Sequence, residues 1–481
     1  MENKNLTGNN VQPQPSVYLV SLGCDKNRVD GETMVGNLRA AGFSVVQDAA
    51  AAAAIIVNTC GFIKDAVLES IDLVLELAAY KQAGSCKGLV IVGCMSERYR
   101  GEIKDSIPEA DAILGVKEYD QIAKVVGGLI GMPAAPGQET KFSRMLARQD
   151  DAIPHVAYVK IAEGCDNHCT YCTIPSIRGA YVSRQMENIL EECDQLLTAG
   201  AKEIVLVAQD SALYGKDIYG EQRLPELLYK LADIMDNYVT GHETATEATS
   251  NGSWNRPPLG VRVMYCYPEH VTEGIVRAIA DIPYVFKYID MPLQHCEDGV
   301  LGRMGRNSSK KSLTALVEKL RADIPGIGIR TTLMVGFPGE TSDDFKAMYN
   351  FVAKMKFDRM GVFPYSREAG TPAANMPNQV RADAKQRRLN RLMELQQKIH
   401  FAKQEEKVGQ SLQVLVDSPA ENPEEAGLNP AKHNYLARTE QDAYEVDAIV
   451  YVESEKPLDI GHFHQVKITE ALQYDLKGIC E

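Results

Sequence analysis

Three cysteines of the segment EGCDNHCTYC, Cys165, Cys169 and Cys172, have the spacing C-x3-C-x2-C on a stretch predicted to be a loop. A structural zinc site closes its shell with four protein ligands, whereas three ligands leave one coordination position open. His168 lies inside the motif, but a fourth ligand there would close the site, so we interpret it as a solvated loop residue. The spacing predicts a metal centre that keeps a position for an outside ligand, with zinc or a redox dithiol as the alternatives.

A second set of three cysteines lies near the N-terminus, where Cys24, Cys60 and Cys94 each end a short apolar run. The runs VYLVSLGC, AAIIVNTC and GLVIVGC are typical of strands buried on both faces of a parallel sheet. The carboxyl ends of such strands share one edge, where ligands bind. We therefore expect the three thiols to lie together, beside glycines that permit close backbone approach, and to suit an iron–sulfur cluster. Taken singly, each would be interpreted as a small buried hydrophobe.

Helical patterns separate these apolar runs, so the N-terminal part is predicted to be a doubly wound βαβ domain. A connector rich in Gly, Pro and Ala follows, and a second α/β series begins with the strand before Cys165. Its strands are predicted at 155–165, 203–210, 261–268, 285–295, 327–340 and 358–366. Six βα units are fewer than the eight of a closed barrel, which predicts an open, partial barrel with its chemistry at the carboxyl ends of the strands.

The C-terminal part has strand patterns at 411–418, 444–454 and 463–472, which predict a small antiparallel β-barrel. The whole chain is therefore predicted to be a multidomain α/β protein. Its predicted divisions are a disordered tail at 1–15, the N-terminal domain at 16–132, a linker at 133–150, the partial barrel at 151–380, a linking helix at 381–408 and the C-terminal barrel at 409–481. The segment 240–258, rich in Thr, Ser, Glu and Asn, is predicted to be an exposed insertion with no assigned function.

The composition favours a cytoplasmic protein. The chain has no apolar run that approaches the roughly 18 residues needed to span a bilayer, and its polar N-terminus lacks the features of a signal peptide. Its 11 cysteines, an odd number, fit poorly with a fully paired disulfide framework. The net charge of −14 argues against nonspecific affinity for nucleic acid and favours a basic protein partner.

The C-x3-C-x2-C motif on the first loop of a βα barrel resembles the signature of radical S-adenosylmethionine enzymes. The strings SLGCDKNRVDGE, VNTCGFI, VGCMSERY, PLQH, TTLMVGFPGET and YSREAGTPA make nearly the whole chain similar to one such family, the methylthiotransferases. The resemblance implies an N-terminal cluster domain, a radical barrel and a C-terminal TRAM barrel. It also implies two 4Fe–4S clusters as cofactors, an auxiliary cluster held by Cys24, Cys60 and Cys94 and a radical cluster held by Cys165, Cys169 and Cys172.

The same resemblance implies how S-adenosylmethionine is used. Its amino and carboxylate groups bind the fourth iron of the radical cluster, and an electron from the cluster cleaves the sulfonium to give a 5′-deoxyadenosyl radical. A second S-adenosylmethionine serves as methyl donor, and the auxiliary cluster carries the sulfur to be transferred. The expected partners include an electron donor such as flavodoxin or ferredoxin.

Other strand ends supply candidate cofactor-binding residues. Tyr171 occupies the position of the family's usual aromatic residue, whose backbone meets the adenine. Gly336 and Gly339 lie in VGFPGET at the end of the fifth strand, where the backbone must approach a ligand closely. Gln209 and Asp210 close the second strand, although Asp210 is equally suited to begin a helix.

One candidate catalytic residue follows the cluster loop. Arg178 in PSIRG is close enough to the cysteines in sequence to pair with a carboxylate, either of the cofactor or of the substrate.

Two branches of the family compete as the source of the function. One modifies a tRNA adenosine beside the anticodon, and the other modifies the β-carbon of an aspartate in protein twelve of the small ribosomal subunit. The C-terminal domain should discriminate, and its carboxylates include Asp417, Glu421, Glu424, Glu425, Glu440, Asp442, Glu445, Asp447, Glu453, Glu455, Asp459, Glu470 and Asp475. An RNA-binding barrel normally shows a basic stripe with exposed aromatics. We therefore predict the ribosomal protein, free or on the small subunit, as the substrate and do not expect a tRNA partner. The alternatives are that these acids are ordinary solubilising surface, and that the chain is an iron–sulfur electron carrier.

Overall fold

The chain forms two compact units in the computed structural model, residues 1–151 and 152–481. The structure describes residues 14–84, 86–132, 155–242 and 258–481. The predicted linker at 133–150, and the greater part of both the predicted tail at 1–15 and the predicted insertion at 240–258, lie outside the described residues. None of the helices in the described part is both long and apolar enough to cross a membrane.

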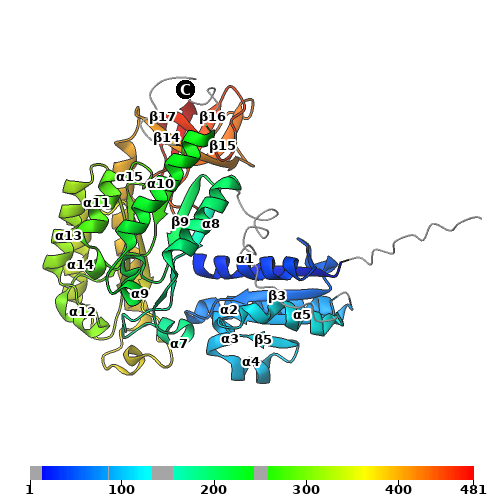
Figure 1. Cartoon of the computed structure of the whole chain (residues 1–481). Coiled ribbons are helices and arrows are strands. Elements are labelled where there is room, and N and C mark those ends of the chain that lie inside the picture. The colour runs from blue at the N-terminus through cyan, green and yellow to red at the C-terminus, as the bar shows by residue number, and fades with distance from the viewer. Residues whose placement is uncertain (1–13, 85, 133–154, 243–257) are drawn as a thin grey trace, which may run out of the picture. The chain divides into compact units, whose positions relative to one another are not determined.

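A five-stranded parallel sheet in the order β2-β1-β3-β4-β5 forms the centre of the first unit (Figure 1). Its strands are β1 (Ser16–Ser21), β2 (Ser44–Val45), β3 (Ala54–Thr59), β4 (Gly88–Gly93) and β5 (Ala112–Leu114). Its helices are α1 (Asp25–Ala40), α2 (Lys64–Gln82), α3 (Cys94–Arg98), α4 (Arg100–Ser106) and α5 (Ile122–Ile130). One core lies beneath α1 and α5 around Leu38 and Val126, and a second lies beneath α2 and α4 around Val74 and Ile103. Helices therefore cover both faces of the sheet, which is the predicted doubly wound arrangement.

The strand order places a topological switch point between β1 and β3. The chain passes from β1 outward to β2, then returns across β1 to β3 and continues to β4 and β5 on the other side. In such sheets ligands bind outside the carboxyl ends of the strands at the switch point. Cys24 and Cys60 follow the two strands at that point, and Cys94 follows the next strand along. The edge strands β2 and β5 were not predicted, because two or three residues are too few for a recognisable pattern.

Six parallel strands form the core of the partial barrel, in two sheets of order β6-β9-β10 and β11-β12-β13. A parallel bridge between Val261 and Val285 joins the two sheets, so β6 and β13 are the edges of an open barrel, as predicted. The strands are β6 (Val156–Lys160), β9 (Glu203–Val207), β10 (Gly260–Val263), β11 (Tyr288–Gln294), β12 (Gly328–Val335) and β13 (Arg359–Pro364). A short pair, β7 (Ala162–Glu163) and β8 (Val182–Ser183), flanks the first of them.

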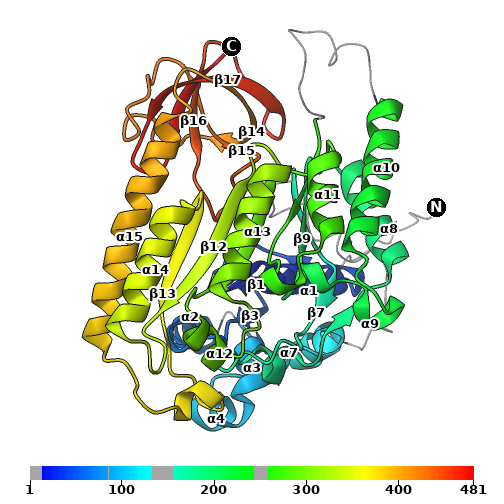
Figure 2. The same ribbon diagram turned by 90° about the vertical axis from the view of Figure 1, so that its left-hand side faces the viewer.

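The helices of this unit lie around the strands, with the longer ones on their outer face (Figure 2). They are α7 (Ile174–Arg178), α8 (Met186–Thr198), α9 (Lys216–Tyr219), α10 (Leu224–His242), α11 (Glu273–Asp281), α12 (Asp298–Met304), α13 (Lys310–Asp323) and α14 (Ser342–Met355). One continuous hydrophobic core joins these helices to the strands, with members such as Ile189, Leu231, Ile279 and Val317 that are almost fully buried. Loops follow the carboxyl ends of the strands, and the loop that carries Cys165 is one of them.

A long helix, α15 (Ala382–Glu405), runs beside β13 to a closed C-terminal barrel (Figure 2). The barrel has the strand order β14-β15-β16-β18-β17. Its strands are β14 (Ser411–Pro419), β15 (His433–Thr439), β16 (Val450–Ser454), β17 (Phe463–Ala471) and β18 (Leu476–Cys480). The expectation of a purely antiparallel barrel needs one correction, since β16 and β18 pair in parallel. Five strands cannot alternate in direction around a closed ring, so at least one pair must be parallel.

Buried ion pairs attach the C-terminal barrel to the amino ends of the partial-barrel strands. The Arg438 guanidinium donates to Asp417, at 2.6 Å and 2.9 Å, and to Glu203 at the start of β9, at 2.8 Å. Glu203 also accepts from Arg262 of β10 at 2.6 Å. Arg438, Glu203 and Arg262 are at most 2% exposed. These charges form one buried network across the two barrels.

Two more arginines, on β12 and β13, extend this contact. The Arg359 guanidinium contacts the carboxylate of Asp442, and the Nε of Arg330 lies 3.4 Å from an oxygen of Asp447. The interpretation of the C-terminal acids as a surface is therefore wrong for part of the set, because Asp417, Asp442 and Asp447 face arginines inside the molecule. The C-terminal barrel accordingly lies at the end of the strands opposite the Cys165 loop.

We expect Arg438→Met to reduce the free energy of unfolding by about 3–5 kcal/mol, because it removes the cation from two buried carboxylates. Urea unfolding of the apoprotein measures the loss. Arg387→Met is the matched control, since Arg387 pairs with Asp383 at 2.8 Å on the exposed surface of α15. An exposed pair of this kind contributes at most about 1 kcal/mol. Equal losses in the two variants would contradict the assignment of the buried network as the main attachment of the C-terminal barrel.

Candidate functional site

The three N-terminal cysteines lie where the chain leaves the sheet edge. Cys24 is the N-cap of α1, Cys60 follows β3 and Cys94 begins α3, and they are exposed, half-buried and buried respectively. A β-carbon on Gly61 would lie 2.7 Å from the Cys94 carbonyl oxygen, and one on Gly23 would lie 3.1 Å from the Cys60 Sγ. Glycine at position 61 therefore lets the chain after Cys60 approach Cys94, and glycine at position 23 lets the chain before Cys24 approach Cys60. This agrees with the expectation that glycines beside the cysteines permit close backbone approach.

Two buried asparagines tie these segments together. The Nδ2 of Asn27 donates to the carbonyl oxygens of Leu22, at 2.8 Å, and of Thr59, at 3.0 Å. The Nδ2 of Asn58 donates to the Asn27 carbonyl oxygen at 2.8 Å, and the Cys94 Sγ lies 3.7 Å from the Asn27 Oδ1. The segments that carry the cysteines are thereby held at a fixed spacing. Sequence analysis assigned no role to either asparagine, although Asn27 lies in SLGCDKNRVDGE and Asn58 in VNTCGFI, because a single Asn beside a cysteine does not reveal its hydrogen-bond partners.

The three N-terminal thiols are not arranged as the ligands of one metal ion. Among the residues that the structure describes, no three His, Cys, Asp or Glu side chains converge closely enough to hold one ion. Thiolates that bind different irons of a cluster lie farther apart than the ligands of one ion. The exposure of Cys24 also leaves the edge of the sheet accessible to a small molecule.

The second set of cysteines lies on the loop between β7 and α7. The N–H of Cys165 donates to the Gly179 carbonyl oxygen at 3.1 Å, and that of Cys172 donates to the Cys169 carbonyl oxygen at 3.1 Å. Burial raises the pKa of Cys165 to about 11 and that of Cys172 to about 12, and the neighbouring thiols add to both shifts. The three sulfur atoms are therefore close enough to repel one another as thiolates, and a bound metal would deprotonate them.

Thr170 fixes this loop to two distant parts of the barrel. Its N–H donates to the Met304 carbonyl oxygen at 3.0 Å, and its Oγ1 donates to that of Arg303 at 2.8 Å, both at the end of α12. Its own carbonyl oxygen accepts from the N–H of Ala373 at 2.9 Å, in the segment after β13. The cysteine loop, which follows β6 and β7, is thus anchored to the segment after β11 and to the segment after β13.

Asp210 holds the loop from the second strand. One oxygen of this fully buried carboxylate lies 3.0 Å from the Asn167 Nδ2, within the cysteine motif, and 2.6 Å from the His270 Nδ1. The other accepts from the Tyr267 N–H at 3.3 Å. The side chain makes no helix-capping bond. Asp210 therefore positions the loop that carries the three cysteines.

Arg178 already has a carboxylate partner within the chain. Its Nη1 lies 3.0 Å from both oxygens of Glu163, which also accepts from the Gln209 Nε2 at 2.8 Å and from the Lys160 Nζ at 2.6 Å. Burial alone would raise the pKa of Glu163, but the charges of Lys160 and Arg178 outweigh it and hold the pKa at about 2. The cation predicted to meet a cofactor or substrate carboxylate is thus engaged by an ionised residue of the same barrel.

The two glycines after β12 form a turn around a buried carboxylate. Gly336 and Gly339 have φ values of 73° and 78°, and the N–H groups of Gly336 and Phe337 donate to the Glu340 carboxylate. Burial raises the pKa of Glu340 to about 7. The Tyr171 ring meets the Phe337 ring edge to face at 6.4 Å, so its side chain packs inward beside this turn.

Several buried polar atoms at the carboxyl ends of the strands have no partner in the described part of the chain. They are the Oε1 of Gln209, the Nε2 of His295 and the Nε of Arg306. A buried polar atom without a partner costs about 1–3 kcal/mol, which a polar ligand can offset. Burial lowers the pKa of His295 to about 3, so its imidazole is neutral. The Gln209 oxygen can accept a hydrogen bond, and the His295 and Arg306 nitrogens can each donate one, since the Nδ1 of His295 already accepts from the Glu297 N–H at 3.0 Å. The sequence singled out only Gln209 of the three.

Three family descriptions match successive parts of the chain. Residues 16–115 match the Uncharacterized protein family UPF0004, residues 159–352 match the Radical SAM superfamily and residues 408–480 match the TRAM domain. Radical SAM proteins use S-adenosylmethionine and a 4Fe–4S cluster, which agrees with the cofactors expected from the Cys165 loop.

Solved structures share the fold at low sequence identity. The radical S-adenosylmethionine methyltransferase TsrM from Kitasatospora setae, with tryptophan substrate and a SAM analogue bound, has a TM-score of 0.51 at 13% identity and covers 73% of each chain. The same protein with cobalamin and a [4Fe-4S] cluster bound gives a TM-score of 0.51 at 15% identity, over 75% of this chain and 77% of that one.

Curated relatives match along nearly the whole length. The ribosomal protein uS12 methylthiotransferase RimO of Desulforamulus reducens is 42% identical over 96% of this chain and 99% of its own, and that of Clostridium kluyveri is 42% identical over 96% and 97%. The protein of the same name from Lachnoclostridium phytofermentans is 41% identical over 97% of this chain and 100% of its own. With this identity over all of its domains, the chain belongs to the radical SAM methylthiotransferase family whose members are named ribosomal protein uS12 methylthiotransferase RimO.

Proposed function

We propose that this chain is a cytoplasmic enzyme that adds a methylthio group to the β-carbon of an aspartate in ribosomal protein uS12. It uses two 4Fe–4S clusters and S-adenosylmethionine, and flavodoxin or ferredoxin supplies electrons. The observation that carries the proposal is the presence of two separate three-cysteine sets, each at the carboxyl edge of a parallel sheet, in a chain similar to the uS12 methylthiotransferases over 96% of its length.

The cysteines have the role of holding each cluster by three thiolates. Cys24, Cys60 and Cys94 bind the auxiliary cluster, and Cys165, Cys169 and Cys172 bind the radical cluster. When bound, these groups supply the sulfur to be transferred and the electron that cleaves S-adenosylmethionine. Protein side chains must leave the fourth iron of each cluster open, because a fourth protein ligand would close the site.

The remaining residues of the site bind the cofactor and orient the cysteine loop. Asp210 holds Asn167 and thereby the shape of the cysteine loop. Gln209 presents an unpartnered buried oxygen that can accept from the amino group of the cofactor. The backbone of the turn at Gly336 and that of Tyr171 would hold the adenine of the cofactor. Arg178 acts through Glu163, which it keeps ionised at the strand end.

Charge on the C-terminal barrel supports a basic protein as substrate. After the buried acids are set aside, its exposed carboxylates are Glu421, Glu424, Glu425, Glu445, Glu455, Asp459, Glu470 and Glu481. Its exposed lysines are Lys456 and Lys467. This balance disfavours contact with RNA phosphates. A substrate that touches both this surface and the Cys165 loop must reach along the whole length of the barrel strands, which a protein or a ribosomal subunit can do.

We expect the reconstituted, anaerobic enzyme to modify uS12 and not tRNA. With S-adenosylmethionine and a reductant, mass spectrometry should show the gain of one methylthio group on an aspartate-containing uS12 peptide, together with 5′-deoxyadenosine. Cys169→Ala should abolish the product, because it removes one iron ligand. Cys193→Ala is the control, since Cys193 is buried in α8 outside both sets. Methylthio adenosine in tRNA with unmodified uS12 would overturn the proposal.

We expect Gly61→Ala to remove one of the two clusters. The new β-carbon would lie 2.6 Å from the Met95 nitrogen and 2.7 Å from the Cys94 carbonyl oxygen, which forces apart the segments that carry Cys60 and Cys94. Iron and sulfide per chain should fall to about half, with the radical cluster retained. Gly101→Ala, in α4 of the same unit, meets no atom within 4 Å and should leave both values unchanged. Full iron content in Gly61→Ala would argue against the auxiliary site.

A further inference from the structure

The sulfur of Cys169 contacts a side chain from another strand. The Tyr267 Oη lies 2.8 Å from the Cys169 Sγ, and Tyr267 follows β10 while Cys169 follows β6. In a free thiol either atom can donate this hydrogen bond. A thiolate bound to a metal has no proton, so in the loaded protein the tyrosine hydroxyl must be the donor.

The tyrosine is held in place by the groups that shape the cysteine loop. Its N–H donates to the Asp210 carboxylate at 3.3 Å, and its ring stacks on the His270 ring with centroids 5.5 Å apart and an interplanar angle of 27°. His270 in turn contacts Asp210 at 2.6 Å, and Asp210 accepts from Asn167 within the motif. One carboxylate therefore sets the positions of both the hydroxyl donor and the loop that carries the sulfur.

A buried cation lies over the same ring. The Cζ of Arg306 is 3.6 Å from the Tyr267 ring centroid, and its side chain is 1% exposed. The Arg306 Nη2 is fixed by the Pro292 carbonyl oxygen at 2.9 Å and by Glu269 at 3.3 Å. A guanidinium against an aromatic face draws electron density from the ring, and with little solvent the effect is strong. The phenol hydroxyl is thereby made a better hydrogen-bond donor to the sulfur.

We propose that Tyr267 is a positioning residue that, together with Arg306, raises the reduction potential of the radical cluster through a hydrogen bond to the Cys169 thiolate. The inference rests on the proposed function, in which Cys169 binds iron. Reduction adds one negative charge to the cluster and its sulfurs, so a hydrogen-bond donor stabilises the reduced state more than the oxidised state. Hydrogen bonds to sulfur are among the factors that set the potential of iron–sulfur clusters.

The test measures the potential of one cluster in isolation. A background chain with Cys24→Ala, Cys60→Ala and Cys94→Ala, reconstituted anaerobically, retains only the radical site. Redox titration followed by electron paramagnetic resonance, without S-adenosylmethionine, gives its midpoint potential. In this background we expect Tyr267→Phe to shift the potential to a more negative value, and Arg306→Gln, which keeps the hydroxyl, to shift it less far in the same direction.

Tyr214→Phe is the matched control. Tyr214 is fully buried in the same barrel, and its hydroxyl donates to the Arg184 carbonyl oxygen at 3.0 Å instead of to a cysteine. The midpoint potential of the Tyr214→Phe variant should equal that of the background chain. An unchanged midpoint potential in Tyr267→Phe would overturn the inference. If Tyr267→Phe failed to hold iron, the Arg306→Gln variant would decide, and an unchanged potential there would overturn the inference. A background chain that binds no iron would instead overturn the proposed function.

Discussion

Parallel β-structure brings residues that are distant in sequence to a common edge, and both candidate metal sites depend on this constraint. In the first unit, the ends of β1, β3 and β4 carry Cys24, Cys60 and Cys94 to the switch point of the sheet. In the second unit, the ends of the barrel strands surround the loop that carries the other three thiols. The first set cannot assemble from one local segment. The second lies on a single loop, but the polar groups that hold this loop come from several strands.

Each cysteine set is kept in shape by a buried polar side chain. Asn27 links the segments after β1 and β3, and Asp210 links the cysteine loop to the end of β10. Both are almost fully buried. Hydrogen bonds from surrounding side chains orient the ligands of a metal site, so residues of this kind are expected around both cysteine sets. This accounts for the dense hydrogen bonding of Thr170, Asn167 and Tyr267 around the loop.

The acidic residues of the second unit either pair with arginines between the two barrels or lie exposed on the surface. Glu203, Asp417 and Asp442 are paired with arginines between the two barrels, where the low dielectric makes a lone charge costly. Other acids, such as Glu424 and Glu455, remain on the surface.

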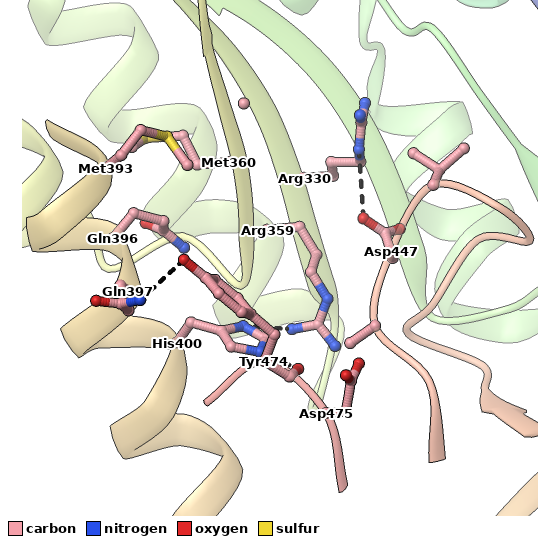
Figure 3. Close-up of a pocket in the computed structure, with 13 residues that line it drawn as sticks. Arg330, Arg359, Met360, Met393, Gln396, Gln397, His400, Asp447, Tyr474 and Asp475 are labelled. Carbon is pink, nitrogen blue, oxygen red and sulfur yellow. Dashed lines mark hydrogen bonds and ion pairs between the residues drawn. The ribbon is translucent and has the colours of Figure 1, made fainter. Parts of the chain in front are cut away.

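The contact between the two barrels contains a cavity of about 310 Å³ lined by Arg330, Arg359, His400 and Tyr474 (Figure 3). The polar groups around this cavity bond to one another, as the Gln397–Tyr474 and Arg359–His400 contacts show.

The sequence by itself determined the order of the domains, the open six-stranded barrel and the two three-cysteine sets, because buried parallel strands and closely spaced thiols leave strong local patterns. It did not determine the parallel β16–β18 pair, the inward direction of Asp417 and Asp442, or the partner of Arg178. It assigned no role to Asn27 or His295, although both lie in strings that carry the family resemblance, and it gave no sign of Tyr267 or Arg306. A charged or polar residue has the same local pattern whether it faces water, an opposite charge or a sulfur atom. Only the tertiary structure decides which of these lies beside it, since the partner comes from a strand far away in the chain.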